Sequence, residues 1–295
     1  MIKRTLLLEN KASITTQHQQ LVIKTEHREA TVPIEDIGFV VIDHPEIYIS
    51  ISAMNFLVEH NAALIICHPK NHLPNGLFMN LNSHHIQQEI FKHQIKASAP
   101  LKKQLWQQTI VEKITNQGIL LEKVTGDKNT FSFLASKVLS GDTTNMEGVA
   151  ANWYWKSFFE QQFKRERFGK YPNNFLNYGY ALLRAATARS LAGSGLLNTL
   201  GIHHKSKYNA FALADDIMEP FRPLVDEKVW ELTQRFPEEE LTTTIKSELL
   251  QVLTRTVYFG EEKSPLMVGL QRTTSSLQQC FTGDRKKINY PKLWN

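Results

Sequence analysis

Cysteine is almost absent from this chain of 295 residues, which contains Cys67 and Cys280 and no Cys-x-x-Cys pair. A thiolate zinc cluster and a disulfide framework are therefore not expected. Long apolar runs are also missing, since no stretch reaches the length of about 18 residues that a membrane helix needs. The opening MIKRTLLLENK lacks the pattern of a secretory signal peptide. We therefore expect a cytoplasmic protein with no membrane partner.

Charge of either sign is not extreme. Charged residues make up 21% of the chain and hydrophobic residues 42%, which is typical of a folded protein, and the length suggests about two domains. The charge is unevenly spread, because residues 1–80 carry 6 Lys and Arg against 8 Asp and Glu, and the remaining residues carry 28 against 21. Any binding of a polyanion is thus expected in the basic C-terminal portion.

Short runs rich in β-branched residues dominate the first 80 residues and predict strands. The runs are RTLLLEN, ASITT, QQLVIKT and DIGFVVIDH, followed by a predicted helix at 51–61 and strands at 62–68 and 76–81. Gaps of this length favour antiparallel hairpins, and hence a small β-sandwich or a curled sheet.

From Ser83 onward, apolar residues recur at spacings of three and four, which indicates helices. The predicted helices cover about residues 86–95, 101–122, 131–139 and 181–191, with another that begins near Thr144. The chain thus divides into a β-rich portion, residues 1–82, and a helical portion, residues 83–295.

Residues 200–223, LGIHHKSKYNAFALADDIMEPFRP, combine a Gly-Ile-His-His turn, a basic loop and an acidic helix. Asp216 and Glu219 are three residues apart, so both carboxylates project from one helix face. An imidazole and carboxylates that meet across a short loop are ligands for a divalent cation. The alternative is that His204 caps a backbone segment and that the carboxylates are solvated.

A second acidic position lies in TNMEG, residues 144–148. We expect Asn145 or Thr144 to cap a helix there, which places Glu147 in the first turn, facing the positive end of the helix dipole. Glutamate is common in first turns for capping reasons alone, so this position by itself does not indicate a site.

Basic and aromatic residues alternate in FKRERFGK, residues 163–170, and NNFLNYGY follows at 173–180. Such interleaving suits a phosphate backbone with some base stacking. The composition is equally compatible with a solvated charged turn before a buried helix.

Three separated blocks, NMEG, NYGYALLRA and GIHH…NAFALADDIMEPFRP, together resemble the CRISPR adaptation integrase family, the first of the CRISPR-associated (Cas) proteins. The resemblance covers essentially the whole chain and is strongest to members that accompany type II systems. It implies an α+β fold with an N-terminal β-sandwich dimerisation domain, residues 1–82. A larger all-α catalytic domain that binds metal and DNA would follow at residues 83–295.

The resemblance also implies a metal site. The family's ligands, a Glu, a His and a carboxylate, match Glu147, His204 and Glu219, and Asp216 matches a carboxylate one turn earlier that would assist catalysis. Two carboxylates and one imidazole favour Mg²⁺ or Mn²⁺ over a structural zinc ion. His203 stands where the family usually has a large apolar residue, and its role is left open.

The implied activity is that of a metal-dependent DNA integrase. A DNA 3′-hydroxyl would attack a phosphodiester to insert new spacers into a CRISPR array, and water as the nucleophile would give an endonuclease. A stand-alone metal-dependent nuclease and a non-catalytic DNA-binding scaffold are the two alternatives. The residues expected to contact DNA are Asn177, Tyr178, Lys164, Arg165, Arg167, Lys205, Lys207 and Arg222.

The implied partners follow from the same resemblance. They are double-stranded DNA, both as protospacer and as CRISPR array, a second copy of the chain forming a homodimer, and the second Cas protein in an integrase complex. The type II effector nuclease is a further candidate.

Overall fold

The computed structural model describes residues 3–80, 84–126, 128, 130–159, 163–166, 169–236 and 240–295. The chain divides into two compact units, Met1–Ser83 and His84–Asn295, and each is described by itself. Residues 81–83, where the strand pattern changes to a helix pattern, lie outside the described part.

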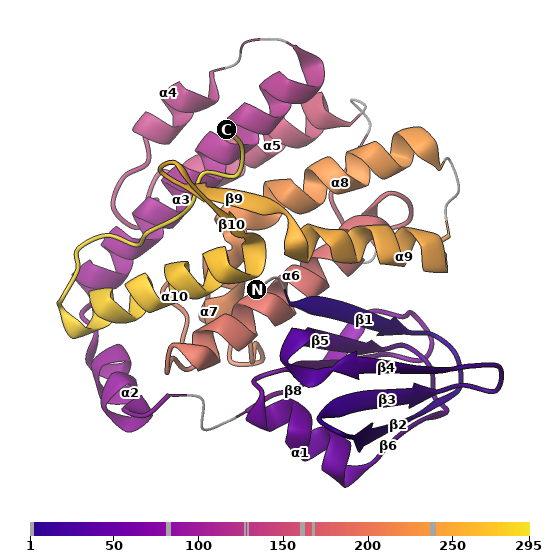
Figure 1. Ribbon diagram of the computed structural model, residues 1–295. Helices are drawn as coiled ribbons and strands as arrows, with labels where there is room; N and C mark the ends of the chain where they lie inside the picture. The colour runs from indigo at the N-terminus through magenta and orange to yellow at the C-terminus, as the bar shows by residue number, and fades with distance from the viewer. Residues whose placement is uncertain are drawn as a thin grey trace. The chain divides into compact units, whose positions relative to one another are not determined.

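The described part of the N-terminal unit contains two four-stranded sheets, drawn in indigo and purple in Figure 1, with the strand orders β1-β5-β7-β8 and β4-β3-β2-β6. Both sheets and the helix α1 contribute to one apolar core, in which Ile14, Leu21, Ile37 and Leu57 are fully buried. The elements are β1 (Arg4–Leu8), β2 (Ala12–Gln17), β3 (Gln20–Lys24), β4 (Glu29–Pro33), η1 (Ile34–Asp36), β5 (Ile37–Ile42), β6 (Ile47–Ile49), α1 (Ile51–Glu59), β7 (Ala63–Cys67) and β8 (Pro74–Phe78).

The expectation of antiparallel hairpins is only half correct. Strands β2, β3 and β4 do form an antiparallel meander. However, β1 pairs with β5, β5 with β7, and β2 with β6 in parallel. Parallel neighbours need crossover connections, which the β2–β4 meander and α1 provide. Strands β4 and β6 were not predicted. β6 has only three residues, and β4 begins within the polar cluster of residues 26–29 that was interpreted as a separator.

The C-terminal unit is mainly helical. Its described elements are α2 (Gln87–Lys96), α3 (Ala99–Thr125), α4 (Phe131–Ser136), α5 (Met146–Phe158), α6 (Asn173–Gly193), α7 (Ala212–Met218), η2 (Glu219–Phe221), α8 (Arg222–Arg235), α9 (Thr243–Leu250), η3 (Gln251–Thr254), β9 (Thr256–Phe259), β10 (Glu262–Pro265) and α10 (Leu266–Thr282). No helix among the described residues is long and apolar enough to cross a bilayer.

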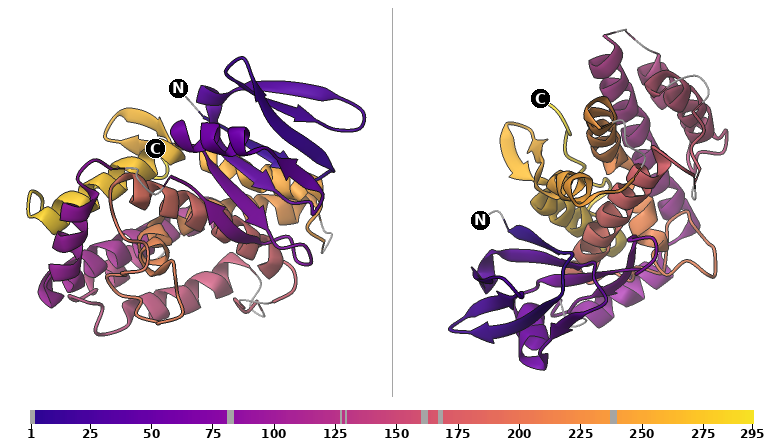
Figure 2. Two further views of the ribbon diagram at one scale, coloured as in Figure 1. Left: turned by 90° about the horizontal axis from the view of Figure 1, so that it is seen from below. Right: turned by 90° about the vertical axis from the view of Figure 1, so that its right-hand side faces the viewer.

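The expectation of an all-α second unit is wrong at one place. Strands β9 and β10 form an antiparallel hairpin, which lies against α10 in Figure 2. Gly260, at a φ of 63°, supplies the left-handed residue of its turn. The sequence TVYFGEEKSP carried this signal, since a β-branched and aromatic run is followed directly by Gly.

Helix α3 is the element around which the C-terminal unit packs. It begins where the Ser98 hydroxyl accepts a hydrogen bond from the Leu101 amide and ends at Gly126, which is left-handed. Along its length it contacts α4, α5, α7, η2 and α8. Side chains on one face of α3 therefore meet residues that are far away in the sequence.

Helices α6 and α8 approach each other closely at Gly179. A Cβ atom at this position would lie 2.4 Å from Val225 Cγ1. We predict that Gly179→Ala lowers the free energy of unfolding by about 1–3 kcal/mol, because both partners are held by the packed core. Urea unfolding monitored by circular dichroism measures the loss.

Gly193→Ala is a matched control on the same helix. Its Cβ would lie 3.1 Å from Gln271 Oε1, the end of a flexible side chain, and alanine favours the helix by up to about 1 kcal/mol. We expect it to be neutral or stabilising. Equal losses in both variants would show that the α6–α8 contact does not require glycine.

Candidate functional site

Glu147 is held at the start of α5 by two caps. The Asn145 side chain accepts a hydrogen bond from the Gly148 amide at 3.2 Å, which confirms the predicted cap. The Asp142 carboxylate accepts hydrogen bonds from the amides of Met146 and Glu147, at 2.9 and 3.0 Å. These contacts satisfy the free amides of the first turn, so the Glu147 side chain is left to point away from its own helix.

The turn that carries the two histidines is built on Asp216, a fully buried residue of α7. Its carboxylate accepts hydrogen bonds from the amides of Ile202, His203 and His204, at 2.7, 3.0 and 3.1 Å. It also lies 2.5 Å from His204 Nδ1. Gly201 is required here, because a Cβ would lie 2.7 Å from Asp216 Oδ2.

This arrangement fixes the orientation of the His204 imidazole. The hydrogen bond to Asp216 raises the pKa of His204, against the opposing effect of burial. With Nδ1 donating to Asp216, the lone pair of Nε2 remains available as a ligand, and the side chain is 42% exposed. Asp216 is thus placed as a positioning residue for His204.

Glu219 lies at the junction between α7 and α8. Helix α7 ends at Met218, Glu219 begins the short turn η2, and Pro223 stands in the first turn of α8. The turn is fastened to α3, since Asn116 Nδ2 donates to the Pro220 carbonyl oxygen at 2.9 Å. The Glu219 side chain is consequently buried, with 4% of its surface exposed.

Lys113 of α3 joins the two glutamates. Its Nζ atom lies 2.6 Å from Glu147 Oε1 and 2.6 Å from Glu219 Oε2, and its side chain is 10% exposed. On the other side, Arg222 Nη2 lies 2.8 Å from Glu219 Oε1. Two carboxylates and two cations therefore alternate in a mostly buried cluster.

The charges of this cluster stabilise each other. Burial alone would raise the pKa of Glu219, but Arg222 and Lys113 outweigh it and lower that pKa. Burial alone would likewise lower the pKa of Lys113, and Glu219 and Glu147 outweigh it and raise that pKa. Glu219 is therefore ionised at neutral pH and the Lys113 ammonium is protonated.

The residues around the cluster fit a hard divalent cation in their chemistry. Glu147 and Glu219 each direct one oxygen at the same point, and Glu219 Oε2 accepts no hydrogen bond from the described residues, although Lys113 is within ion-pair distance. Carboxylate oxygens and one imidazole are ligands for Mg²⁺ or Mn²⁺. No three His, Cys, Asp or Glu side chains are gathered closely enough to hold a metal, as far as the described residues go. The point of convergence is taken by Lys113.

A further buried carboxylate, that of Asp226 on α8, was not anticipated from the sequence. It accepts hydrogen bonds from the hydroxyls of Tyr154, at 2.9 Å, and Tyr180. The guanidinium groups of Arg222 and Arg165 lie over the Tyr180 ring, with Cζ 4.7 and 5.2 Å from its centroid. Burial raises the pKa of Asp226 to about 6.

The residues expected to contact DNA are not all at the surface. Arg165 donates from Nη2 to Asn177 Oδ1 at 2.7 Å, which ties the segment before α6 to that helix. Lys164 is 84% exposed. Tyr178 is fully buried, so its ring faces the interior. Lys205 and Lys207 are exposed, Arg222 pairs with Glu219, and Arg167 lies outside the described residues.

His203 packs against α3. Its ring lies parallel to that of Trp106, with 4.1 Å between the centroids and 4° between the planes. The Trp106 ring also meets His204 edge-on, with centroids 6.0 Å apart. The stacking gives His203, whose role was left open, a structural contact with α3.

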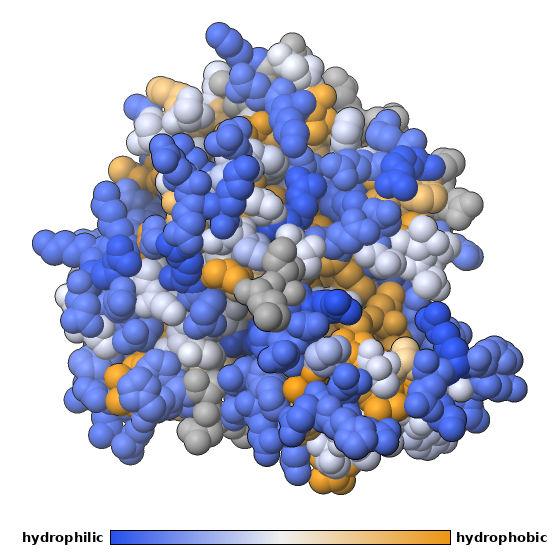
Figure 3. Space-filling model, viewed as in Figure 1, coloured by the Kyte–Doolittle hydropathy of each residue, from blue (hydrophilic) through white to orange (hydrophobic). Residues whose placement is uncertain are grey.

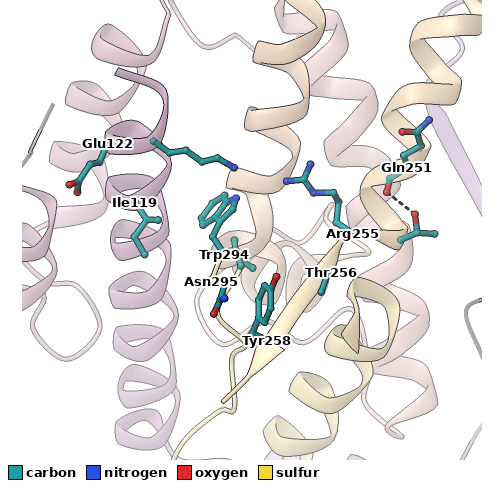
Figure 4. A pocket seen from close by; sticks show the side chains of 11 residues that line it. Ile119, Glu122, Gln251, Arg255, Thr256, Tyr258, Trp294 and Asn295 are labelled. Carbon is teal, nitrogen blue, oxygen red and sulfur yellow. Dashed lines mark hydrogen bonds between the residues drawn. The ribbon is translucent and has the colours of Figure 1, made fainter. Parts of the chain in front are cut away.

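A cavity of about 990 Å³ lies elsewhere in the C-terminal unit, and neither Glu147 nor Glu219 lines it. Figure 4 shows Trp294 of the C-terminal tail and Arg255 directed into the same space. Both bind the buried Glu227, Trp294 through Nε1 at 3.1 Å, and Lys123 Nζ reaches its other oxygen at 2.5 Å. Arg255 and Lys123 thus share one buried carboxylate, and the exposed Glu122 also lines the cavity.

Comparisons with known proteins agree on one family. The family model described as CRISPR associated protein Cas1 matches residues 5–248. The chain is 36% identical over 297 residues to the CRISPR-associated endonuclease Cas1 of Neisseria meningitidis serogroup C, and the match covers 99% of this chain and 97% of the relative.

Two solved structures are similar in fold. A casposase bound to its integration product superposes with a TM-score of 0.79 at 20% identity, covering 97% of this chain and 92% of that one. A chain of a Cas6-RT-Cas1–Cas2 complex gives a TM-score of 0.76 at 20% identity, covering 99% of this chain and 36% of that one.

The elevated pKa of Asp226 makes a prediction for stability. A carboxyl group whose pKa is about 6 in the folded protein and 3.8 ordinarily binds a proton more tightly when folded. The free energy of unfolding therefore falls as the pH rises from about 4 to about 6, by on the order of 3 kcal/mol relative to Asp226→Asn, and the difference is then constant. Urea unfolding between pH 4 and 8 measures it.

Tyr180→Phe gives the matching control. It removes a hydrogen bond that lowers the pKa of Asp226, so we expect the fall in stability to extend to higher pH. If wild type and Asp226→Asn show parallel stability curves over this range, the carboxyl group does not ionise there.

Proposed function

The chain belongs to the CRISPR-associated Cas1 family, and we propose that it is a divalent-metal-dependent DNA integrase that inserts new spacers into a CRISPR array and also has DNA endonuclease activity. The observation that carries the proposal is the convergence of Glu147 and Glu219, from two separate helices, on one cationic position. His204, oriented by Asp216, would complete the ligand set.

The chemistry is a transesterification. The 3′-oxygen of the incoming DNA forms a bond to phosphorus, the bond from phosphorus to the 3′-oxygen of the target strand breaks, and the proton lost by the attacking hydroxyl is balanced by protonation of the leaving oxygen. Bound Mg²⁺ or Mn²⁺ would polarise the phosphoryl oxygen and stabilise the negative charge of the leaving oxygen. No covalent enzyme intermediate is needed.

The protein's own residues position the reactants. Asp216 keeps the proton on His204 Nδ1, which leaves Nε2 for a ligand, and Arg222 holds Glu219 from the opposite side. The exposed Lys164, Lys205 and Lys207 supply positive charge for DNA phosphates. Arg165 is tied to Asn177, so its proposed role is to shape the surface next to the phosphate contacts.

The proposed partners are double-stranded DNA, a second copy of the chain and the second Cas protein. The Cas6-RT-Cas1–Cas2 complex, one chain of which is similar in fold, supports the last of these. Exposed apolar side chains of the N-terminal unit support a homodimer: Tyr48, Ile51, Ile66 and Phe78. Figure 3 shows apolar patches at the lower right, over this unit. The type II effector nuclease remains a further candidate, and the DNA substrates imply a reaction in the cytoplasm.

We predict the following for strand transfer of a duplex with free 3′-hydroxyls into a supercoiled CRISPR plasmid, with the partner protein and Mn²⁺ present. His204→Ala and Glu219→Gln each reduce joining by more than about a hundredfold, because a ligand is lost. Asp216→Asn reduces it roughly 10- to 100-fold, because the ligand His204 is no longer held. Product formation on gels gives the rates, and circular dichroism confirms folding.

Glu122→Gln is the matched control, since Glu122 is an exposed residue of α3 away from the cluster. It should join DNA as wild type does. Folded His204→Ala and Glu219→Gln proteins that join normally would refute the assigned site. Degradation of the plasmid without joining by wild type would favour a nuclease that does not integrate.

A further inference from the structure

The ammonium of Lys113 occupies the position that any cation shared by Glu147 and Glu219 would take. Its Nζ atom is 2.6 Å from one oxygen of each carboxylate. Those two oxygens belong to α5 and η2, and both elements pack on α3. Its placement is not incidental, because Asn116, one turn further along α3, fastens the same face of the helix to the Pro220 carbonyl. The backbone is thereby fixed at the height of the glutamates.

An ammonium and a metal ion cannot share this position. Mg²⁺ binds carboxylate oxygens at about 2.0–2.1 Å, so an ion held by both oxygens occupies nearly the same space as the Lys113 nitrogen. Two adjacent cations would also repel each other strongly in a site this buried. Binding of the metal therefore requires Lys113 to move.

The geometry points to Lys113 as a built-in cation that occupies the metal position between Glu147 and Glu219 in the metal-free protein and is displaced when Mg²⁺ or Mn²⁺ binds. This inference rests on the proposed metal centre. It accounts for the absence of a ready three-residue metal cluster among the described residues. It also gives the buried Glu219 a second counterion beside Arg222 while no metal is bound.

The Lys113 side chain would move toward the Glu147 end of the cluster when it is displaced. The Glu147 end of the cluster is the more open, with 26% of the Glu147 side chain exposed against 4% for Glu219. The four-carbon stem of a lysine lets the ammonium swing toward this side without moving α3. Arg222 stays with the other oxygen of Glu219, so the buried carboxylate keeps one partner throughout.

The test is a measurement of Mn²⁺ binding by calorimetry, without DNA and at a single fixed pH. It compares wild type with the variants Lys113→Met and Lys113→Arg. Lys113→Met removes the competing charge at nearly constant volume, so we expect its Kd for Mn²⁺ to be at least about tenfold lower. The thermal midpoint of the metal-free variant should fall, and Mn²⁺ should raise it more than in wild type. Lys113→Arg keeps a cation and should bind Mn²⁺ no more tightly than wild type.

Lys123→Met is the matched control. Lys123 lies on the same helix and pairs with the buried Glu227 at 2.5 Å. Its loss leaves that buried carboxylate with the cationic partner Arg255, just as the loss of Lys113 leaves Glu219 with Arg222. It should lower the thermal midpoint and leave the Kd for Mn²⁺ unchanged. A similar gain in affinity in Lys113→Met and Lys123→Met would show a general charge effect and overturn the inference.

Failure of the metal centre is separable from failure of this inference. If the Glu219→Gln variant binds Mn²⁺ as tightly as wild type does, the proposed centre is wrong. If Glu219→Gln abolishes binding but Lys113→Met binds Mn²⁺ as wild type does, or more weakly, the centre stands and Lys113 is not a competitor.

Reductive methylation tests the same displacement with the wild-type protein alone, so it does not depend on whether a variant folds. Lys113 should be protected from formaldehyde and borohydride without metal, and its methylation, followed by mass spectrometry, should rise when Mn²⁺ is added. Lys123, whose side chain is 52% exposed, should react equally in both states. Protection of Lys113 that does not change with Mn²⁺ would overturn the displacement.

Discussion

The ion-pair cluster of Glu147, Lys113, Glu219 and Arg222 is the constraint on which the rest of the C-terminal unit depends. A carboxylate buried as deeply as that of Glu219 is tolerated only with counterions at contact distance. The start of α5, the middle of α3 and the junction of α7 with α8 must therefore meet at one place. The caps of α5 and the hydrogen bond from Asn116 to the η2 turn hold these segments in place.

Three of the buried acids on α7, η2 and α8 show how the same chemical group is used differently. Asp216 accepts backbone amides and orients an imidazole, Glu219 faces an ammonium and a guanidinium, and Asp226 accepts two phenol hydroxyls. The surroundings shift the pKa values of Glu219 and Asp226 in opposite directions. Glu219, with two cations in contact, is held charged, whereas burial raises the pKa of Asp226 to about 6.

Much of the fold was predictable because its signals are local. The spacing of apolar residues predicted the helices that became α2, α3, α4 and α6, and the cap at Asn145 was confirmed. Strand pairing was not predictable to the same degree, since β1 and β5 are adjacent in space but separated by a whole meander. The hairpin of β9 and β10 was missed although its turn glycine and β-branched run are visible in the sequence.

For the site, the sequence determined which residue types are available: a glutamate in a first helical turn, a paired histidine, and carboxylates spaced along one helix. Family resemblance, not spacing, selected Glu147, His204 and Glu219 among them, and that selection remains a prediction. Lys113 could not be found in this way, because a lysine within a long helix looks like an ordinary solvated residue. Only the tertiary structure decided that it is buried, since its environment comes from α5 and η2, 34 and 106 residues further along the chain.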